Sequence, residues 1–156
     1  MSVAFRREGD DEHLEPKFEL PIPPGPNWVT ARGLRLTRER VEALEAVSIE
    51  GFSEEDGKKH KRVLRYWRTR LATAELRPVP DGESVAFGTR VTYRLNGREK
   101  RVALVGDDEA DPNEGRISFS SPLARAIMGA GKGETVDFAG KDDAINILAI
   151  EIVDQD

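Results

Sequence analysis

Residues 85–106 read VAFGTRVTYRLNGREKRVALVG, and this stretch decides the fold. Apolar and polar residues alternate on both sides of Asn96 and Gly97, and a period of 2 is typical of strands with one buried face. Asn-Gly supplies the two left-handed residues that a type I′ turn requires. The stretch therefore predicts an antiparallel β-hairpin.

The chain after this hairpin continues with short strands and one helix. GRISFS predicts a strand, and Ser120 or Ser121 can cap a helix that has Pro122 in its first turn and Gly129 past its end. ETVDFAG and AINILAIEIV predict two more strands. This order predicts an α+β domain over residues 80–156, with one short helix packed on an antiparallel sheet.

The chain before the hairpin has a helical period. Thr30 is a candidate N-cap, and an apolar stripe with 3/4 spacing follows it. Its members are Leu34, Thr37, Val41, Leu44 and Ser48. Gly51 and Gly57 interrupt the pattern, which resumes at Leu64 and stops at Pro78. We therefore expect an antiparallel helical hairpin, a coiled coil, over residues 30–77.

Residues 1–29 form an acidic, proline-rich segment, which we interpret as a flexible tail. They carry 3 basic and 6 acidic residues, whereas residues 30–76 carry 11 and 8, and residues 77–156 carry 10 and 15. The balance is far from that of an autonomous DNA-binding domain and favours a protein partner. No apolar run approaches a membrane span, and cysteine is absent, which fits a cytoplasmic protein.

The acidic stretch Val105–Glu134 begins like a calcium loop, because Asp107, Glu109, Asp111 and Asn113 alternate. A calcium loop of this kind needs glycine at its sixth position and glutamate at its twelfth. Those positions hold Pro112 and Ser118, so the pattern does not predict calcium binding. Two histidines without cysteine also argue against a structural zinc site.

The same stretch, VGDDEADPNEGRISFSSPLARAIMGAGKGETV, closely resembles the C-terminal signature of the bacterial GreA/GreB transcription elongation factors. That signature has Val-Gly, an acidic cluster with Glu-Ala-Asp, Ile-Ser, Ser-Pro-Leu-Ala-Arg-Ala and a later Gly-Glu. FGTRVTY and ILAIEIV also match, so the resemblance covers about residues 84–153.

The resemblance implies an FKBP-like C-terminal domain that docks at the secondary channel of RNA polymerase while a coiled coil enters the channel. Acids at the coiled-coil tip then help to hold a second Mg²⁺ at the active centre of the polymerase, which hydrolyses backtracked RNA. We therefore expect a regulator that is not itself an enzyme, needs no cofactor, and contacts nascent RNA and DNA only within the elongation complex.

Three groups of site residues follow from this resemblance. The polymerase-docking residues are Ser120, Ser121, Pro122, Leu123, Ala124 and Arg125. The hairpin-tip acids are Glu50, Glu54, Glu55 and Asp56, of which Glu54 and Asp56 would serve a transient Mg²⁺ with the polymerase. A basic face that can lie along RNA or the channel wall comprises Lys58, Lys59, Lys61 and Arg62.

Two departures leave other functions open. Gly51 stands where the family has its first tip acid, and the hairpin, Thr30 to Leu76, is shorter than in the family. Both features resemble the regulators of nucleoside diphosphate kinase and favour a channel-occupying competitor without cleavage activity. A more remote alternative is an FKBP-type prolyl isomerase, which would need an aromatic pocket. Its candidate lining residues are Phe87, Tyr93, Phe119 and Phe138.

Overall fold

The computed structural model describes residues 19–156, so most of the tail predicted for residues 1–29 lies outside the described residues. The described chain forms two compact units. A two-helix unit contains residues 19–25 together with Arg38–Thr73, and a sheet unit contains Pro26–Thr37 together with Ala74–Asp156. Residues 26–37 therefore group with the sheet, although the sequence placed them in the tail and the hairpin.

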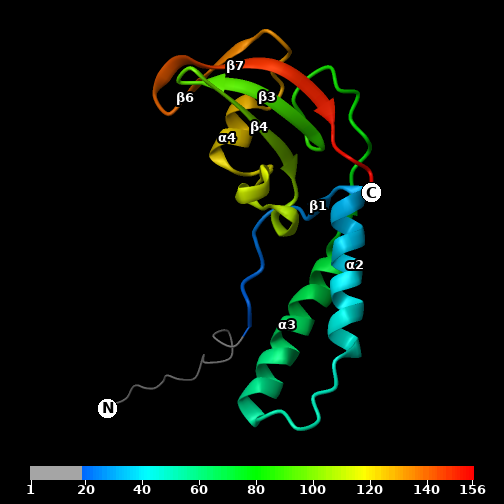
Figure 1. Ribbon diagram of the computed structural model, residues 1–156. Helices are drawn as coiled ribbons and strands as arrows, with labels where there is room; N and C mark the ends of the chain where they lie inside the picture. Colours follow the sequence, from blue (N-terminus) through cyan, green and yellow to red (C-terminus); the bar gives the residue numbers. More distant parts are fainter. Residues whose placement is uncertain (1–18) are drawn as a thin grey trace, which may run out of the picture. The chain divides into compact units, whose positions relative to one another are not determined.

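The sheet unit is built on five strands in the order β5-β4-β3-β7-β6 (Figure 1). The predicted hairpin is present as β3 (Thr89–Leu95) and β4 (Arg98–Val105), which pair antiparallel. Asn96 and Gly97 join them with φ values of 52° and 75°, the left-handed conformation that the Asn-Gly pair predicted.

The expectation of a wholly antiparallel sheet is wrong at one edge. The strand β5 (Arg116–Ser118) pairs parallel with β4, so the sheet is mixed. Two 3₁₀ turns, η2 (Asp107–Glu109) and η3 (Pro112–Glu114), return the chain from the end of β4 to the level of Ala103, so that β5 pairs with the last three residues of β4. Two neighbouring parallel strands need a connection that brings the chain back along the first strand. The alternation of apolar and polar residues does not reveal such a connection.

The other edge carries β6 (Thr135–Phe138) and β7 (Lys141–Ile152), which pair antiparallel as the sequence predicted. The helix α4 (Pro122–Ile127) covers one face of the sheet. Ser121 caps α4, because its hydroxyl accepts a hydrogen bond from the backbone N–H of Ala124.

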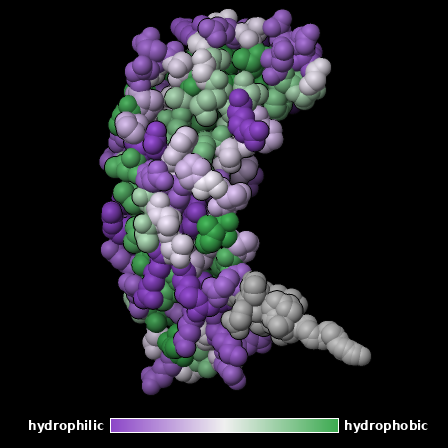
Figure 2. Space-filling view, turned by 180° about the vertical axis from the view of Figure 1, so that it is seen from behind, coloured by the Kyte–Doolittle hydropathy of each residue, from purple (hydrophilic) through white to green (hydrophobic). Residues whose placement is uncertain are grey.

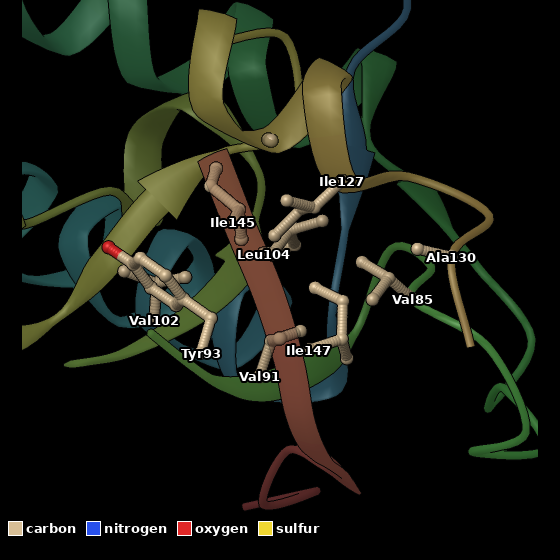
Figure 3. Packing of buried hydrophobic residues seen from close by; sticks show 10 residues of the cluster. Val85, Val91, Tyr93, Val102, Leu104, Ile127, Ala130, Ile145 and Ile147 are labelled. Atoms are coloured by element: carbon tan, nitrogen blue, oxygen red, sulfur yellow. The ribbon is translucent and has the colours of Figure 1, made fainter. Parts of the chain in front are cut away.

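The core of the sheet unit lies between α4 and the strands β3, β4 and β7. Figure 3 shows its side chains converging from these elements. Val91, Leu104, Ile127, Ile145 and Ile147 are completely buried. Burial of each such side chain contributes about 1.5–3 kcal/mol relative to an exposed one, so this cluster holds the sheet and helix together.

The two segments of helical period form α2 (Ala31–Ala46) and α3 (Glu54–Thr73). Thr30 caps α2, because its hydroxyl oxygen accepts from the N–H of Gly33 at 3.0 Å. The second helix ends before Pro78: Glu75–Leu76 form β2, which pairs parallel with β1 (Trp28–Val29). The expected end at Pro78 is thus wrong, because this strand pairing ends the helix first.

Within the two-helix unit, α2 and α3 run side by side in opposite directions (Figure 1). Arg68 of α3 donates to Glu45 of α2 at 2.9 Å, and the guanidinium of Arg40 lies 4.9 Å from the Trp67 ring centroid. The coiled-coil pairing and the FKBP-like class stay predictions. No helix in residues 19–156 is long and apolar enough to cross a membrane.

Candidate functional site

Glu109 of the acidic stretch is a buried structural bridge. Its side chain is 5% exposed and accepts hydrogen bonds from the Thr30 hydroxyl at 2.6 Å and from Nη1 of Arg32 at 3.0 Å. Thr30 immediately precedes α2, and Arg32 lies in the first turn of that helix. Thr30 is 79 positions from Glu109 in the chain, so this charge-assisted contact joins distant parts of the sequence. The carboxylate therefore holds the first turn of α2 against the sheet unit.

Two glycines make this approach possible. A Cβ at Gly33 would lie 2.8 Å from the Glu109 carboxylate, and a Cβ at Gly106 would lie 2.2 Å from the backbone oxygen of Trp28. The second distance is impossible without moving backbone. The glycine of the Val-Gly motif is therefore required by the contact between the end of β4 and β1.

Asp107 organises the turn that leads into α4. Its carboxylate accepts from the Ser118 hydroxyl at 2.6 Å and faces the Ser120 hydroxyl at 3.5 Å. The Ser118 oxygen also accepts from the backbone N–H of Ser120 at 3.1 Å. This network fixes the conformation of residues 118–120, so part of the acidic stretch holds the serine-proline segment in place.

An aromatic cluster supports the same region. The rings of Trp28 and Phe119 stack with centroids 4.7 Å apart, and Phe87 packs edge-on against both at 5.8 and 5.5 Å. The guanidinium of Arg77 lies 4.6 Å from the Trp28 ring centroid. The sequence does not predict this cluster. Trp28 lies in the segment interpreted as a tail, and the residues around it show neither a helical nor a strand period.

The six predicted docking residues divide between surface and core. Ser120, Pro122 and Arg125 are exposed, whereas Ala124 is completely buried and Leu123 packs against the core. Ser121 is half-buried and caps α4. The structure thus leaves the first three side chains accessible to a partner and uses the other three to build the helix.

The predicted tip acids lie mainly in a helix. Glu54, Glu55 and Asp56 form the first turn of α3, so Gly57 does not break the helix as the sequence suggested. Ser53 explains the early start, because its hydroxyl accepts from the N–H of Asp56 at 3.0 Å. Acids in a first helical turn interact favourably with the helix dipole.

The acids do not converge on one point. Glu54 and Asp56 are two positions apart in a helix, so their side chains point to different sides. Glu54 lies 3.4 Å from Lys58, and Glu50 stands in the turn before the helix. Residues 19–156 contain no group of three or more His, Asp or Glu side chains placed to hold a metal ion.

The predicted basic face lies on the first half of α3. Lys58, Lys59 and Lys61 are exposed, and Arg62 is half-buried. Figure 2 shows mostly hydrophilic residues over the two-helix unit, interrupted by a few hydrophobic ones. The turn between the helices carries three exposed apolar residues, Val47, Ile49 and Phe52, each at least 40% exposed.

The aromatic residues named for a prolyl isomerase site are used in packing. Tyr93 is 3% exposed within the main core, and this burial raises the pKa of its hydroxyl. Phe138 packs against the same core, while Phe87 and Phe119 belong to the cluster around Trp28. These four rings do not form a shared lining for a substrate.

Comparison with known proteins identifies the sheet unit. This unit is an α+β module with a mixed sheet and a short capped helix on one face of it. Residues 80–152 match the family model described as transcription elongation factor GreA/GreB, C-terminal. Residues 80–152 are thus similar to the C-terminal domain of the GreA/GreB factors.

The curated relatives share only this part. The transcription elongation factors GreA of Brucella canis and Brucella suis are 42% identical over 76 residues, which are 46% of this chain and 48% of each relative. The chain thus matches about half the length of these relatives.

Two solved structures are similar over more of the chain. The GreA factor homolog 1 of Thermus thermophilus is 18% identical, covering 81% of this chain and 99% of its own, with a TM-score of 0.37. The GreA/GreB factor from Nitrosomonas europaea is 22% identical, covering 84% and 98%, with a TM-score of 0.33.

Proposed function

We propose that this chain is a transcription elongation regulator that binds RNA polymerase at its secondary channel through the GreA/GreB domain. The main support is the family match of residues 80–152, together with the exposure of Ser120, Pro122 and Arg125 on a segment that Asp107 holds rigid. A surface whose conformation is already fixed loses little entropy on binding, which suits it to docking.

The docking proposal is tested with the full chain and core RNA polymerase. Arg125→Glu reverses an exposed charge on α4 without touching the core, and we expect it to weaken binding about tenfold, or ~1.4 kcal/mol. Lys141→Glu makes the same charge change at an exposed position on β7 and serves as the control. Equal affinities of both variants and the wild type would exclude α4 as the docking segment.

We further propose that the chain occupies the channel as a competitor and stimulates transcript cleavage weakly or not at all. A second Mg²⁺ needs carboxylates that converge with phosphate oxygens, whereas Glu54 and Asp56 point to different sides of α3. Gly51 has φ 86°, a conformation that favours glycine over the acid found there in the family. Both observations favour the competitor over the cleavage factor.

A backtracked elongation complex with labelled RNA separates the two functions. We expect the wild type to displace a cleavage-competent factor without producing short RNA fragments. The variant Glu54→Ala/Asp56→Ala should compete as well as the wild type. Strong cleavage by the wild type that the double variant loses would instead show that these acids serve the polymerase.

A further inference from the structure

The described chain begins on the surface of α3. Glu19 accepts two hydrogen bonds from Arg65, from Nη2 at 2.5 Å and from Nε at 3.0 Å. Leu20 and Ile22 follow beside Tyr66 and Thr69 and line a shallow pocket with them. Glu19 thus lies at Arg65, and the higher-numbered Leu20 and Ile22 lie beside the later residues Tyr66 and Thr69, so residues 19–22 run in the same direction as α3.

The surface of α3 before Arg65 is basic. Lys58, Lys61 and Arg62 lie one and two turns before Arg65, within reach of the same face. Lys61 and Arg62 form no ion pair with any residue in the described range. The hydrogen bonds from Arg65, with its charge and that of Arg62, lower the pKa of Glu19, so this face already stabilises a carboxylate.

An apolar groove adjoins the basic residues. Leu44, Val47 and Ile49 line one side of it, and Lys61 and Leu64 of α3 line the other. Arg65 and Arg68 belong both to this groove and to the pocket that holds Leu20 and Ile22. The two depressions therefore meet at Arg65 and Arg68, and the groove combines apolar side chains with the positive charge of α3.

The sequence immediately before Glu19 has the complementary character. Residues 8–15 read EGDDEHLE, with five acids and one leucine. Glu15 is four residues from Glu19, and an extended chain of that length spans ~13 Å. Two turns of α3 span ~11 Å, so the acids reach the level of Lys58 and Lys61 without strain.

We propose that the acidic segment 8–15 binds in cis to the groove between α2 and α3, with its acids on the basic residues of α3 and Leu14 over the apolar ones. The segment then covers the same basic face that would otherwise lie along a polyanion such as RNA. It competes for that face and limits its contact with nucleic acid. The contact involves this chain alone, so its test is independent of polymerase binding.

The absence of cysteine allows a direct test in the full chain. A nitroxide spin label on His13→Cys lies within the segment but leaves its acids in place. We expect it to broaden the amide NMR signals of residues 58–65 more than those of β3 and β7. This excess broadening should disappear at about 1 M salt, where the Debye length falls to about 3 Å.

A pair of charge variants checks the mechanism. Replacing the five acids of residues 8–15 by Asn or Gln should abolish the broadening of α3. The control removes five exposed acids of the sheet unit, Glu83, Glu134, Asp142, Asp154 and Asp156, and should preserve it. Absent broadening, or broadening unaffected by neutralising the segment, would overturn the proposal. So would transfer of the broadening to an isotope-labelled chain mixed with spin-labelled unlabelled protein, because a second copy would then fill the groove.

Discussion

Replacing Glu109 by alanine should destabilise the sheet unit more than the same replacement of any other acid in the acidic stretch. The substitution removes a carboxylate that is 5% exposed and accepts hydrogen bonds from Thr30 and Arg32. Hydrogen bonds to a charged group contribute about 1.5–3 kcal/mol each. Arg32 is 29% exposed and can turn to water, so its bond contributes at the low end. We therefore expect a loss of roughly 3–4.5 kcal/mol in the free energy of unfolding.

Urea unfolding followed by tryptophan fluorescence measures this loss. The chain has two tryptophans, and Trp67→Phe leaves Trp28, which stacks on Phe119 in the sheet unit, as the only reporter. The comparison is made in this background. At an m-value of about 1–3 kcal/mol/M, the expected loss lowers the urea midpoint by about 1 M or more.

Two matched variants separate the bridge from general effects of charge. Glu109→Gln keeps the size and one acceptor oxygen of Glu109, so its loss should be intermediate. Glu114→Ala removes an exposed acid from the next turn and should change stability by less than about 0.5 kcal/mol. If Glu109→Ala and Glu114→Ala unfolded at the same urea concentration, the inferred bridge to α2 would not exist in solution.

Three further outcomes follow from the structure. Gly106→Ala should destabilise the sheet unit strongly, by about 3 kcal/mol or more, because its Cβ would lie 2.2 Å from the Trp28 backbone oxygen; a thermal melt by circular dichroism checks this. Leu104→Ala should cost about 2–5 kcal/mol in urea unfolding, because Leu104 is completely buried. The Arg65–Glu19 contact should persist above pH 4.5 and be lost as the pH falls through the lowered pKa of Glu19. The NMR shift of the Glu19 carboxyl carbon measures this titration, and a midpoint at or above pH 4.5 in the full chain would contradict the contact.

The elements with a local signal could be predicted from the sequence. The β3–β4 hairpin follows from alternation and from Asn96-Gly97, and α4 follows from its capping serine and Pro122. The parallel pairing of β5 with β4 could not be predicted, since it depends on two 3₁₀ turns whose acids and proline are equally compatible with an open loop. The same holds for β1 and β2, which are two residues each.

The candidate site could likewise be predicted from the sequence only in part. The docking segment was found because its motif is contiguous, but which of its residues face outward depends on α4 packing on the sheet. The sequence does not distinguish Glu109 from the other acids of the stretch, because its partners Thr30 and Arg32 stand far away in the sequence. Only the three-dimensional fold distinguishes a buried bridging carboxylate from its exposed neighbours.

The pairing of β1 with β2 brings the two ends of the helical segment 30–74 together. Trp28–Val29 and Glu75–Leu76 lie side by side, so the chain that enters α2 and the chain that leaves α3 are joined by the same two-stranded sheet. Seven residues added to each helix extend the arm by about 10 Å and keep the apolar faces in register. Evolution or protein engineering can therefore lengthen or shorten α2 and α3 together without changing the residues of the sheet unit.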